Sequence, residues 1–278
     1  MIKSITAKLS ILFLLIAITT CYYEREIHEE LEICFVKNDS IWTMNIDGSE
    51  QRQITFSGLD YSPSWSPDGD KIVFYSDRIN PSQIFIINKD GSGLKQITNT
   101  TGIDENRYPT WFPDGKKIIY TGQRSASIFI FIANLDGIIE QQIYSSLSPL
   151  QGSISPDGNY VIFNVEFGYL SRMNINTGLF ENVTTNPFNS GNSWSPDGSQ
   201  IAFSNGSTIS VGNPYAYDTF TNIYSSASNY PCWTPDGKKI IFSDSTFGIC
   251  SIETDGSDLR HLTNTSGDNS PCVQGKPR

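Results

Sequence analysis

The sequence has few of the residues on which nucleic-acid-binding and metal sites depend. Its 278 residues include 2 histidines, and 19 Lys and Arg stand against 29 Asp and Glu, so the net charge is −10. Nucleic-acid binding needs basic residues that neutralise phosphates, so DNA and RNA are not expected partners. His28 and His261 each lack a second His or a suitably spaced Cys, which excludes a zinc site of ordinary spacing. We expect no metal ion and no other cofactor.

Catalytic motifs are also missing. The sequence has no Gly-x-Ser-x-Gly segment, and two histidines are too few to support a Ser-His-Asp arrangement. The Asn-x-Asp-Gly segments that begin at Asn45, Asn88 and Asn134 resemble half of a calcium loop, but they lack its leading Asp and its closing Glu. These segments are better interpreted as hairpin turns. The sequence therefore predicts a protein that is not an enzyme.

The N-terminus carries the one hydrophobic run that needs explaining. Lys3 and Lys8 precede a mostly apolar segment over 9–18, which Thr19, Thr20 and Cys21 follow. This pattern is typical of a secretory signal and is too short for a membrane span of about 20 residues. The Ile-Thr-Thr-Cys ending resembles a bacterial lipobox, although Thr20 replaces the usual Gly, Ala or Ser. We expect residues 1–20 to be a lipoprotein signal peptide and Cys21 to be the lipidation site, with ordinary secretion or an uncleaved anchor as alternatives.

The segment after this signal predicts where the protein acts. Residues 21–30 are polar, show no periodicity and are expected to form a short tether. Nine extended residues reach roughly 30 Å, so the folded part should lie close to its membrane. Loss of residues 1–20 removes Lys3 and Lys8 but no acidic residue, which makes the net charge −12. We expect a lipoprotein of the bacterial cell envelope that contacts the membrane through its lipid only. It should face the periplasm or the cell exterior, with the outer membrane favoured.

The rest of the chain is repetitive. Pro-Asp-Gly occurs five times at intervals of 46, 43, 40 and 39 residues, with its Asp at Asp68, Asp114, Asp157, Asp197 and Asp236. A Trp stands three residues before the Asp in four of the copies, and Ile154 replaces it in the third. Pro presets the backbone angle of a turn, Asp bonds nearby N–H groups and Gly accepts a positive φ. Each copy therefore predicts a β-hairpin.

A second hairpin follows each of these turns at a similar offset. Asp-Gly between alternating apolar residues is a strong hairpin signal, and it recurs over 41–55, 84–98, 130–144 and 249–263. Each unit of about 42 residues then holds four short strands, a to d, as in the blade of a β-propeller. Residues 31–38 match a b strand without a preceding hairpin, and residues 270–273 match an a strand at which the chain stops. We predict an all-β, six-bladed β-propeller over 31–278, with one blade closed by strands from both termini.

The repeated Trp-Ser-Pro-Asp-Gly-Lys-x-Ile-x-Phe and Asn-x-Asp-Gly-Ser units resemble the WD-like (PD40) repeats of the TolB family of six-bladed propellers. The resemblance covers about residues 31–278 and implies the fold, but a fold hosts many activities. TolB itself carries an additional N-terminal α/β domain, for which this sequence has no room, so its partner binding is not transferred residue by residue.

Four cysteines remain if Cys21 carries lipid. Cys34 aligns with Val73 and Cys272 with Ser64, which are neighbouring positions on adjacent strands. A Cys34–Cys272 disulfide is therefore a candidate and would contribute roughly 2–5 kcal/mol. Cys232 and Cys250 align with strands two spacings apart, about 9.6 Å, which exceeds the bridging limit of about 7 Å. Small residues recur at the positions of Ser64 and Cys272, and we attribute them to packing between neighbouring blades.

Candidate binding residues lie just before each a strand, in the loops expected to surround the mouth of the central channel. Variable loops on a rigid scaffold commonly carry binding sites, although these residues could also be merely solvated. We predict a monomeric scaffold that binds an envelope protein or a peptide; the alternative is a carbohydrate-binding or carbohydrate-active propeller that uses the same mouth. The candidate residues are Asp60, Tyr61, Arg107, Tyr108, Gln151, Asn192, Asn229, Tyr230, Asp268 and Asn269.

Overall fold

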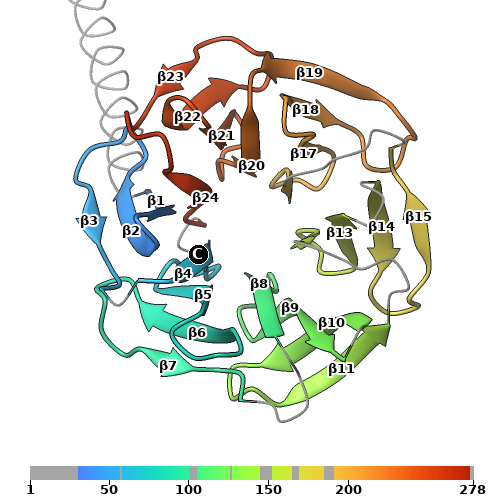
Figure 1. Cartoon of the computed structure of the whole chain (residues 1–278). Coiled ribbons are helices and arrows are strands. Elements are labelled where there is room, and N and C mark those ends of the chain that lie inside the picture. The colour runs from blue at the N-terminus through green and yellow to red at the C-terminus, as the bar shows by residue number, and fades with distance from the viewer. Residues whose placement is uncertain are drawn as a thin grey trace, which may run out of the picture.

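The computed structural model describes residues 31–56, 58–99, 105–125, 127–144, 152–164, 169–184 and 191–275. These residues form six four-stranded antiparallel sheets arranged as a ring, which confirms the predicted six-bladed propeller (Figure 1). The predicted signal peptide, Cys21 and the tether lie outside the described residues. Within the described part of the chain, no helix is long and apolar enough to cross a membrane.

Each blade runs from an inner strand a to an outer strand d, and we number the blades from the one that contains the first strand. Blade 1 consists of β24 (Asn269–Val273), β1 (Glu32–Lys37), β2 (Ser40–Asn45) and β3 (Arg52–Gln53). Blade 2 consists of β4 (Asp60–Trp65), β5 (Lys71–Ser76), β6 (Gln83–Asn88) and β7 (Lys95–Gln96). Blade 3 consists of β8 (Glu105–Trp111), β9 (Lys117–Arg124), β10 (Ser127–Asn134) and β11 (Ile139–Tyr144).

The second half of the ring follows the same order. Blade 4 consists of β12 (Gly152–Ile154), β13 (Tyr160–Asn164), β14 (Leu170–Asn174) and β15 (Phe180–Asn182). Blade 5 consists of β16 (Asn192–Trp194), β17 (Ile201–Ser204), β18 (Thr208–Gly212) and β19 (Phe220–Ser225). Blade 6 consists of β20 (Ser228–Trp233), β21 (Lys239–Asp244), β22 (Gly248–Glu253) and β23 (Arg260–His261).

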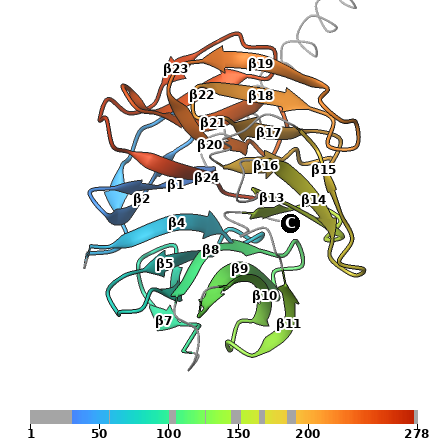
Figure 2. The same cartoon turned by 45° about the vertical axis from the view of Figure 1, so that its right-hand side comes forward.

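Blade 1 closes the ring with strands from both ends of the chain. β24 pairs antiparallel with β1, and Cys272 lies opposite Cys34 in this register. Figures 1 and 2 both show the red C-terminal strand beside the blue N-terminal one. The side chain of Gln274 extends the closure, because its Nε2 donates to the carbonyl of Gly69 in blade 2 at 2.8 Å. The predicted closure is confirmed, and without β24 the inner edge of β1 would be unpaired.

The hydrophobic core lies between blades rather than within them. Between blades 2 and 3, Val73 and Ile84 pack against Trp111 and Phe131, all of which are buried. The recurring Trp also connects the two blades through a polar contact, since Trp111 Nε1 donates to the carbonyl of Ser64 at 3.1 Å. Trp194 bonds the carbonyl of Ser153 in the same way, at 3.2 Å. Each blade therefore depends on its neighbour for burial, as expected for a repeat architecture.

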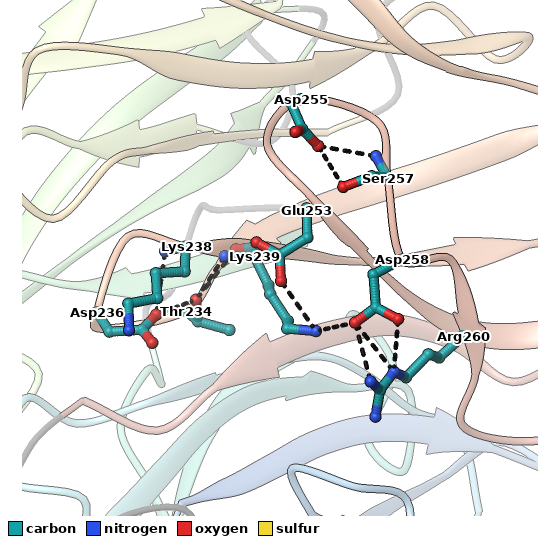
Figure 3. A network of polar contacts seen from close by, with 9 residues as sticks. All are labelled: Thr234, Asp236, Lys238, Lys239, Glu253, Asp255, Ser257, Asp258 and Arg260. Atoms are coloured by element: carbon teal, nitrogen blue, oxygen red, sulfur yellow. Dashed lines mark hydrogen bonds and ion pairs between the residues drawn. The ribbon is translucent and has the colours of Figure 1, made fainter. Parts of the chain in front are cut away.

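The Pro-Asp-Gly and Asp-Gly turns lie on one face of the ring, because the a–b and c–d connections of an antiparallel blade fall at the same end. Figure 3 shows the two turns of blade 6, whose side chains satisfy their own backbone. In blade 6, Asp236 accepts from the Thr234 hydroxyl at 2.6 Å and from the Lys238 N–H at 3.1 Å. Gly237 has φ +70°, the left-handed conformation that a side chain disfavours. In the next turn, the Asp255 carboxylate accepts from the N–H and the hydroxyl of Ser257. The sequence-based assignment of these segments to turns is confirmed.

Ion pairs cross the same face of blade 6. Lys239 Nζ lies 3.2 Å from Glu253 and 2.7 Å from Asp258, and Arg260 also pairs with Asp258 at 3.0 Å. Figure 3 shows these side chains pointing toward one another. Such exposed pairs contribute little stability, about 0–1 kcal/mol each. These four side chains of blade 6 therefore partly neutralise one another.

Candidate functional site

The central channel narrows to a cavity of about 100 Å³ whose wall comes from the a strands. One small residue from each blade lines it: Ser64, Thr110, Ser153, Ser193, Cys232 and Cys272. Sequence analysis attributed these residues to packing between blades. That interpretation was incomplete, because they contact neighbouring blades, as Ser64 and Thr110 do at 3.3 Å, and also face the bore. Larger side chains here would fill the channel.

Four of the a strands share a bulge where the channel opens. The residue before the strand proline has a positive φ in each: Ser62 (+48°), Tyr108 (+54°), Tyr230 (+54°) and Ser270 (+51°). The strand register shifts at the same places. A non-Gly residue in this conformation costs about 1–3 kcal/mol, and such residues tend to cluster at functional sites. Bulges re-aim side chains, and all four residues line the channel mouth.

The mouth is a wider cavity of about 570 Å³ between blades 1, 2, 3 and 6. It brings together six of the predicted residues: Tyr61, Tyr108, Asn229, Tyr230, Asp268 and Asn269. Arg107 lies beside it, in a separate hollow of about 100 Å³ that Tyr108 also lines, and pairs with Glu105 at 3.1 Å. The structure thus gathers most of the predicted residues in one place.

Two more of the predicted residues do not line the mouth cavity. Asp60 is fully buried and binds Arg78 at 2.6 Å, so its carboxylate holds the loop together and does not face the mouth. Asn192 is buried deeper, on the wall of the narrow channel, where it accepts from the Ser153 hydroxyl at 2.5 Å. Asp60 is held away from the mouth by its ion pair with Arg78, and Asn192 stands directly before Ser193, level with the wall of the narrow channel. Gln151 lies outside the described residues.

The tyrosines of the mouth contact one another. The rings of Tyr61 and Tyr75 lie 5.3 Å apart, and Tyr108 meets Tyr75 edge-on at 5.5 Å. Burial raises the pKa of both Tyr61 and Tyr75, and the nearby Asp39 carboxylate adds to the rise at Tyr61. The hydroxyls therefore stay protonated at neutral pH and can donate hydrogen bonds, while the rings offer flat apolar contact area.

Two kinds of residue at the mouth were not predicted from the sequence. Tyr75 and Asp244 come from the ends of b strands, and Ser266 comes from the loop before β24. The signal for the first two was available: strands a and b are antiparallel, so the end of b lies at the same edge as the start of a. Only the residues before strand a had been considered.

A cluster of three thiols lies where blades 6 and 1 meet. Cys34 and Cys272 are directly opposite, as predicted, and the Val273 N–H donates to Cys232 Sγ at 3.3 Å. All four described cysteines are free thiols, and across the described residues no three His, Cys, Asp or Glu side chains are arranged to hold a metal ion. Sequence analysis missed the approach of Cys232 to Cys272, because that contact crosses between blades and the alignment compared positions within one.

We expect Cys272 to be the first of these thiols to react. The neighbouring thiols of Cys232 and Cys34 lower the pKa of Cys272, whereas burial raises that of Cys34. Since the thiolate is the nucleophile, iodoacetamide near neutral pH should modify Cys272 well before Cys34. Mass spectrometry of tryptic peptides measures the order, and equal rates would contradict it.

The Cys34–Cys272 disulfide stays a prediction. Non-reducing peptide mapping after exposure to oxidised glutathione tests it, and a Cys232–Cys272 peptide in its place would show that the wrong partner was chosen.

A family profile matches part of this chain. The profile described as the TolB beta propeller domain, PD40, matches residues 33–177. A TolB homologue from Chlorobium luteolum is 41% identical over 56 residues, which is 20% of this chain and 13% of that protein. The match therefore spans a small part of the relative's length.

Solved structures share the propeller at low identity. TolB from Acinetobacter baumannii has a TM-score of 0.78 at 20% identity, over 90% of this chain and 68% of that one. A putative TolB from Agrobacterium tumefaciens has a TM-score of 0.72 at 19% identity, over 89% of this chain and 98% of that one. A chain of a nidogen/laminin complex has a TM-score of 0.73 at 11% identity, over 89% of this chain and 99% of that one. These likenesses show the same fold.

Proposed function

This chain belongs to the TolB β-propeller domain family, and from that premise we propose that it is a non-enzymatic binding protein of the bacterial envelope. Its channel mouth takes a partner protein or peptide. The observation that supports this proposal is the mouth cavity of about 570 Å³, to which four blades contribute and which Tyr61, Tyr75, Tyr108 and Tyr230 line. Tyrosine is enriched in protein interfaces because it combines a large contact area with a polar end.

The walls of the mouth are held rigidly, which favours binding. The Asp244 carboxylate accepts from the Tyr224 hydroxyl at 2.9 Å and from the N–H groups of Thr246 and Phe247. Burial opposes its ionisation, but these donors lower its pKa, so the charged group organises the loop. A site with a preset shape loses less conformational entropy when its partner binds.

Partner recovery tests the proposal. The full-length chain, crosslinked in envelopes and solubilised in detergent, should recover a protein partner. Tyr108→Ala should reduce recovery at least about tenfold, since buried aromatic anchors dominate interface energies. Tyr217→Ala is the matched control, because Tyr217 is 57% exposed in the connection between β18 and β19, on the turn face.

Two results would count against this function. Equal recovery by wild type and Tyr108→Ala would remove the mouth as the binding site. Turnover or tight binding of a polysaccharide that depends on Tyr108 would favour the carbohydrate-active alternative instead.

The proposal includes anchoring through lipid on Cys21. It rests on the signal and lipobox-like sequence. Metabolic labelling with palmitate checks it, and labelling that persists in Cys21→Ser would contradict it.

A further inference from the structure

Asp268 is a buried carboxylate that no cation of the described residues pairs with directly. The residue is 2% exposed, and neither of its carboxylate oxygens has a partner at hydrogen-bond distance. Burial raises its pKa and outweighs the opposing influence of the nearby Thr263 hydroxyl and of the Lys37 charge. Buried charges in proteins are otherwise paired or bound to a cation. Asp268 lines the mouth cavity, so a ligand that enters the mouth meets this position.

The repeat itself shows how the same position is satisfied elsewhere. Asp60 in blade 2 is equivalent to Asp268: each stands two residues before a serine with positive φ, Ser62 and Ser270, that precedes the strand proline. Both oxygens of Asp60 accept from Arg78 Nη2, at 2.6 and 2.8 Å. In this chain, a guanidinium is the group that compensates a carboxylate at this place in a blade.

Blade 1 lacks its own arginine. Asp60 pairs with Ser76 in the blade 2 register, and Arg78 follows two residues later. In blade 1, Val36 pairs with Asn269, which makes Lys37 the equivalent of Ser76 and Asp39 the equivalent of Arg78. An acidic residue thus stands where the compensating cation would be.

Lys37 does not form a hydrogen bond with Asp268 in place of the missing arginine. Its Nζ bonds Gln51 Oε1 at 3.1 Å and lies 5.3 Å from the ring centre of Trp42. This places the ammonium on the outer strands of blade 1, away from a hydrogen bond with Asp268.

The mouth is suited to a cation from outside. The described residues that line it include Asp244, Asp268 and four tyrosines, but neither Lys nor Arg. Tyrosine rings attract guanidinium groups, by about 0.5–2 kcal/mol according to burial. Arg107 of this chain already lies over the Tyr75 ring, 5.7 Å from its centre, so an incoming guanidinium would use the other three tyrosines. The space beside the preceding residue is open, because a Cβ added at Gly267 would meet no atom within 4 Å.

We propose that Asp268 binds the guanidinium of an arginine side chain that a partner peptide inserts into the channel mouth, as Arg78 does for Asp60 within the chain. This inference rests on the proposed function and specifies the chemistry of the partner. The partner segment would carry at least one arginine that becomes buried on binding. Charge-assisted hydrogen bonds between guanidinium and carboxylate are strong and directional, which suits this role.

Two immobilised octapeptide pools test the proposal. They differ at one fixed position, which is arginine in one pool and its neutral isostere citrulline in the other, and their remaining positions are randomised without charged residues. The full-length chain in detergent should be retained at least tenfold more by the arginine pool. Asp268→Asn should reduce that ratio below twofold, whereas Asp255→Asn, an exposed carboxylate of the turn face, should preserve it.

Further variants separate the possible failures. Thermal melting shows whether Asp268→Asn is folded, and Lys37→Met should leave the arginine preference intact. A preference that arises only in Lys37→Met would mean that Lys37 already occupies the site, and would overturn the proposal. Binding of Ca²⁺ that Asp268→Asn abolishes would overturn it as well, because the carboxylate would then serve a metal ion.

Equal binding of both pools that still depends on Tyr108 would overturn the arginine assignment alone. Binding of both pools that ignores Tyr108→Ala would remove the proposed function too.

Discussion

A chain that ends at Asp268, and so lacks β24, should fail to fold. β24 is the inner strand of blade 1, and without it the edge of β1 loses its partner. Val273 also leaves the cluster of buried residues that includes Ile33 and Ile241, which joins blade 1 to blade 6. The lost side-chain burial and hydrogen bonds amount to about 5 kcal/mol, comparable to the whole stability of a domain.

Circular dichroism and thermal melting measure this result. The truncated chain should show no cooperative unfolding transition, or should be recovered as aggregate through its exposed strand edge. A chain that ends at Gly275 is the control, because it keeps every described residue and should melt like the full chain. A cooperative melt of the shorter chain within a few degrees of the control would refute the closure by β24.

Trp111→Ala should destabilise the propeller by about 3–5 kcal/mol, which is the usual cost of truncating a buried aromatic side chain. Trp111 packs between blades 2 and 3 against Val73 and Phe131, so its loss leaves a cavity at the joint that both blades share. The melting temperature should fall by roughly 10 °C. Urea denaturation gives the free energy directly, from the shift in midpoint at constant slope.

A pair of milder variants isolates the hydrogen bond of this tryptophan. Trp111 Nε1 donates to the Ser64 carbonyl, whereas the buried Nε1 of Trp65 has no hydrogen-bond partner. Trp111→Phe should therefore cost about 1 kcal/mol more than Trp65→Phe. Equal losses would mean that the contact between the blades contributes nothing to stability.

Local features of the chain could be predicted from its sequence, whereas contacts between side chains of different strands could not. Turn and strand assignments succeeded because they depend on local chemistry: Pro-Asp-Gly forms a turn whatever surrounds it, and Asp236 satisfies its own neighbours. Asp60 was misplaced because its role depends on Arg78, which follows the neighbouring strand β5, 18 residues further along the chain. The contact of Cys232 with Val273 was missed because the two residues belong to different blades.

By itself, the sequence determined the repeat, the number of blades and the closure by both termini. These features follow from residue spacing, because each unit must bury its apolar strands against the next. Only the tertiary structure decided which polar groups are satisfied. Asp60 and Asp268 occupy the same position of the repeat, yet one binds an arginine and the other has no hydrogen-bond partner. That difference arises from side chains that meet across strands and blades, where distance in the sequence carries no information.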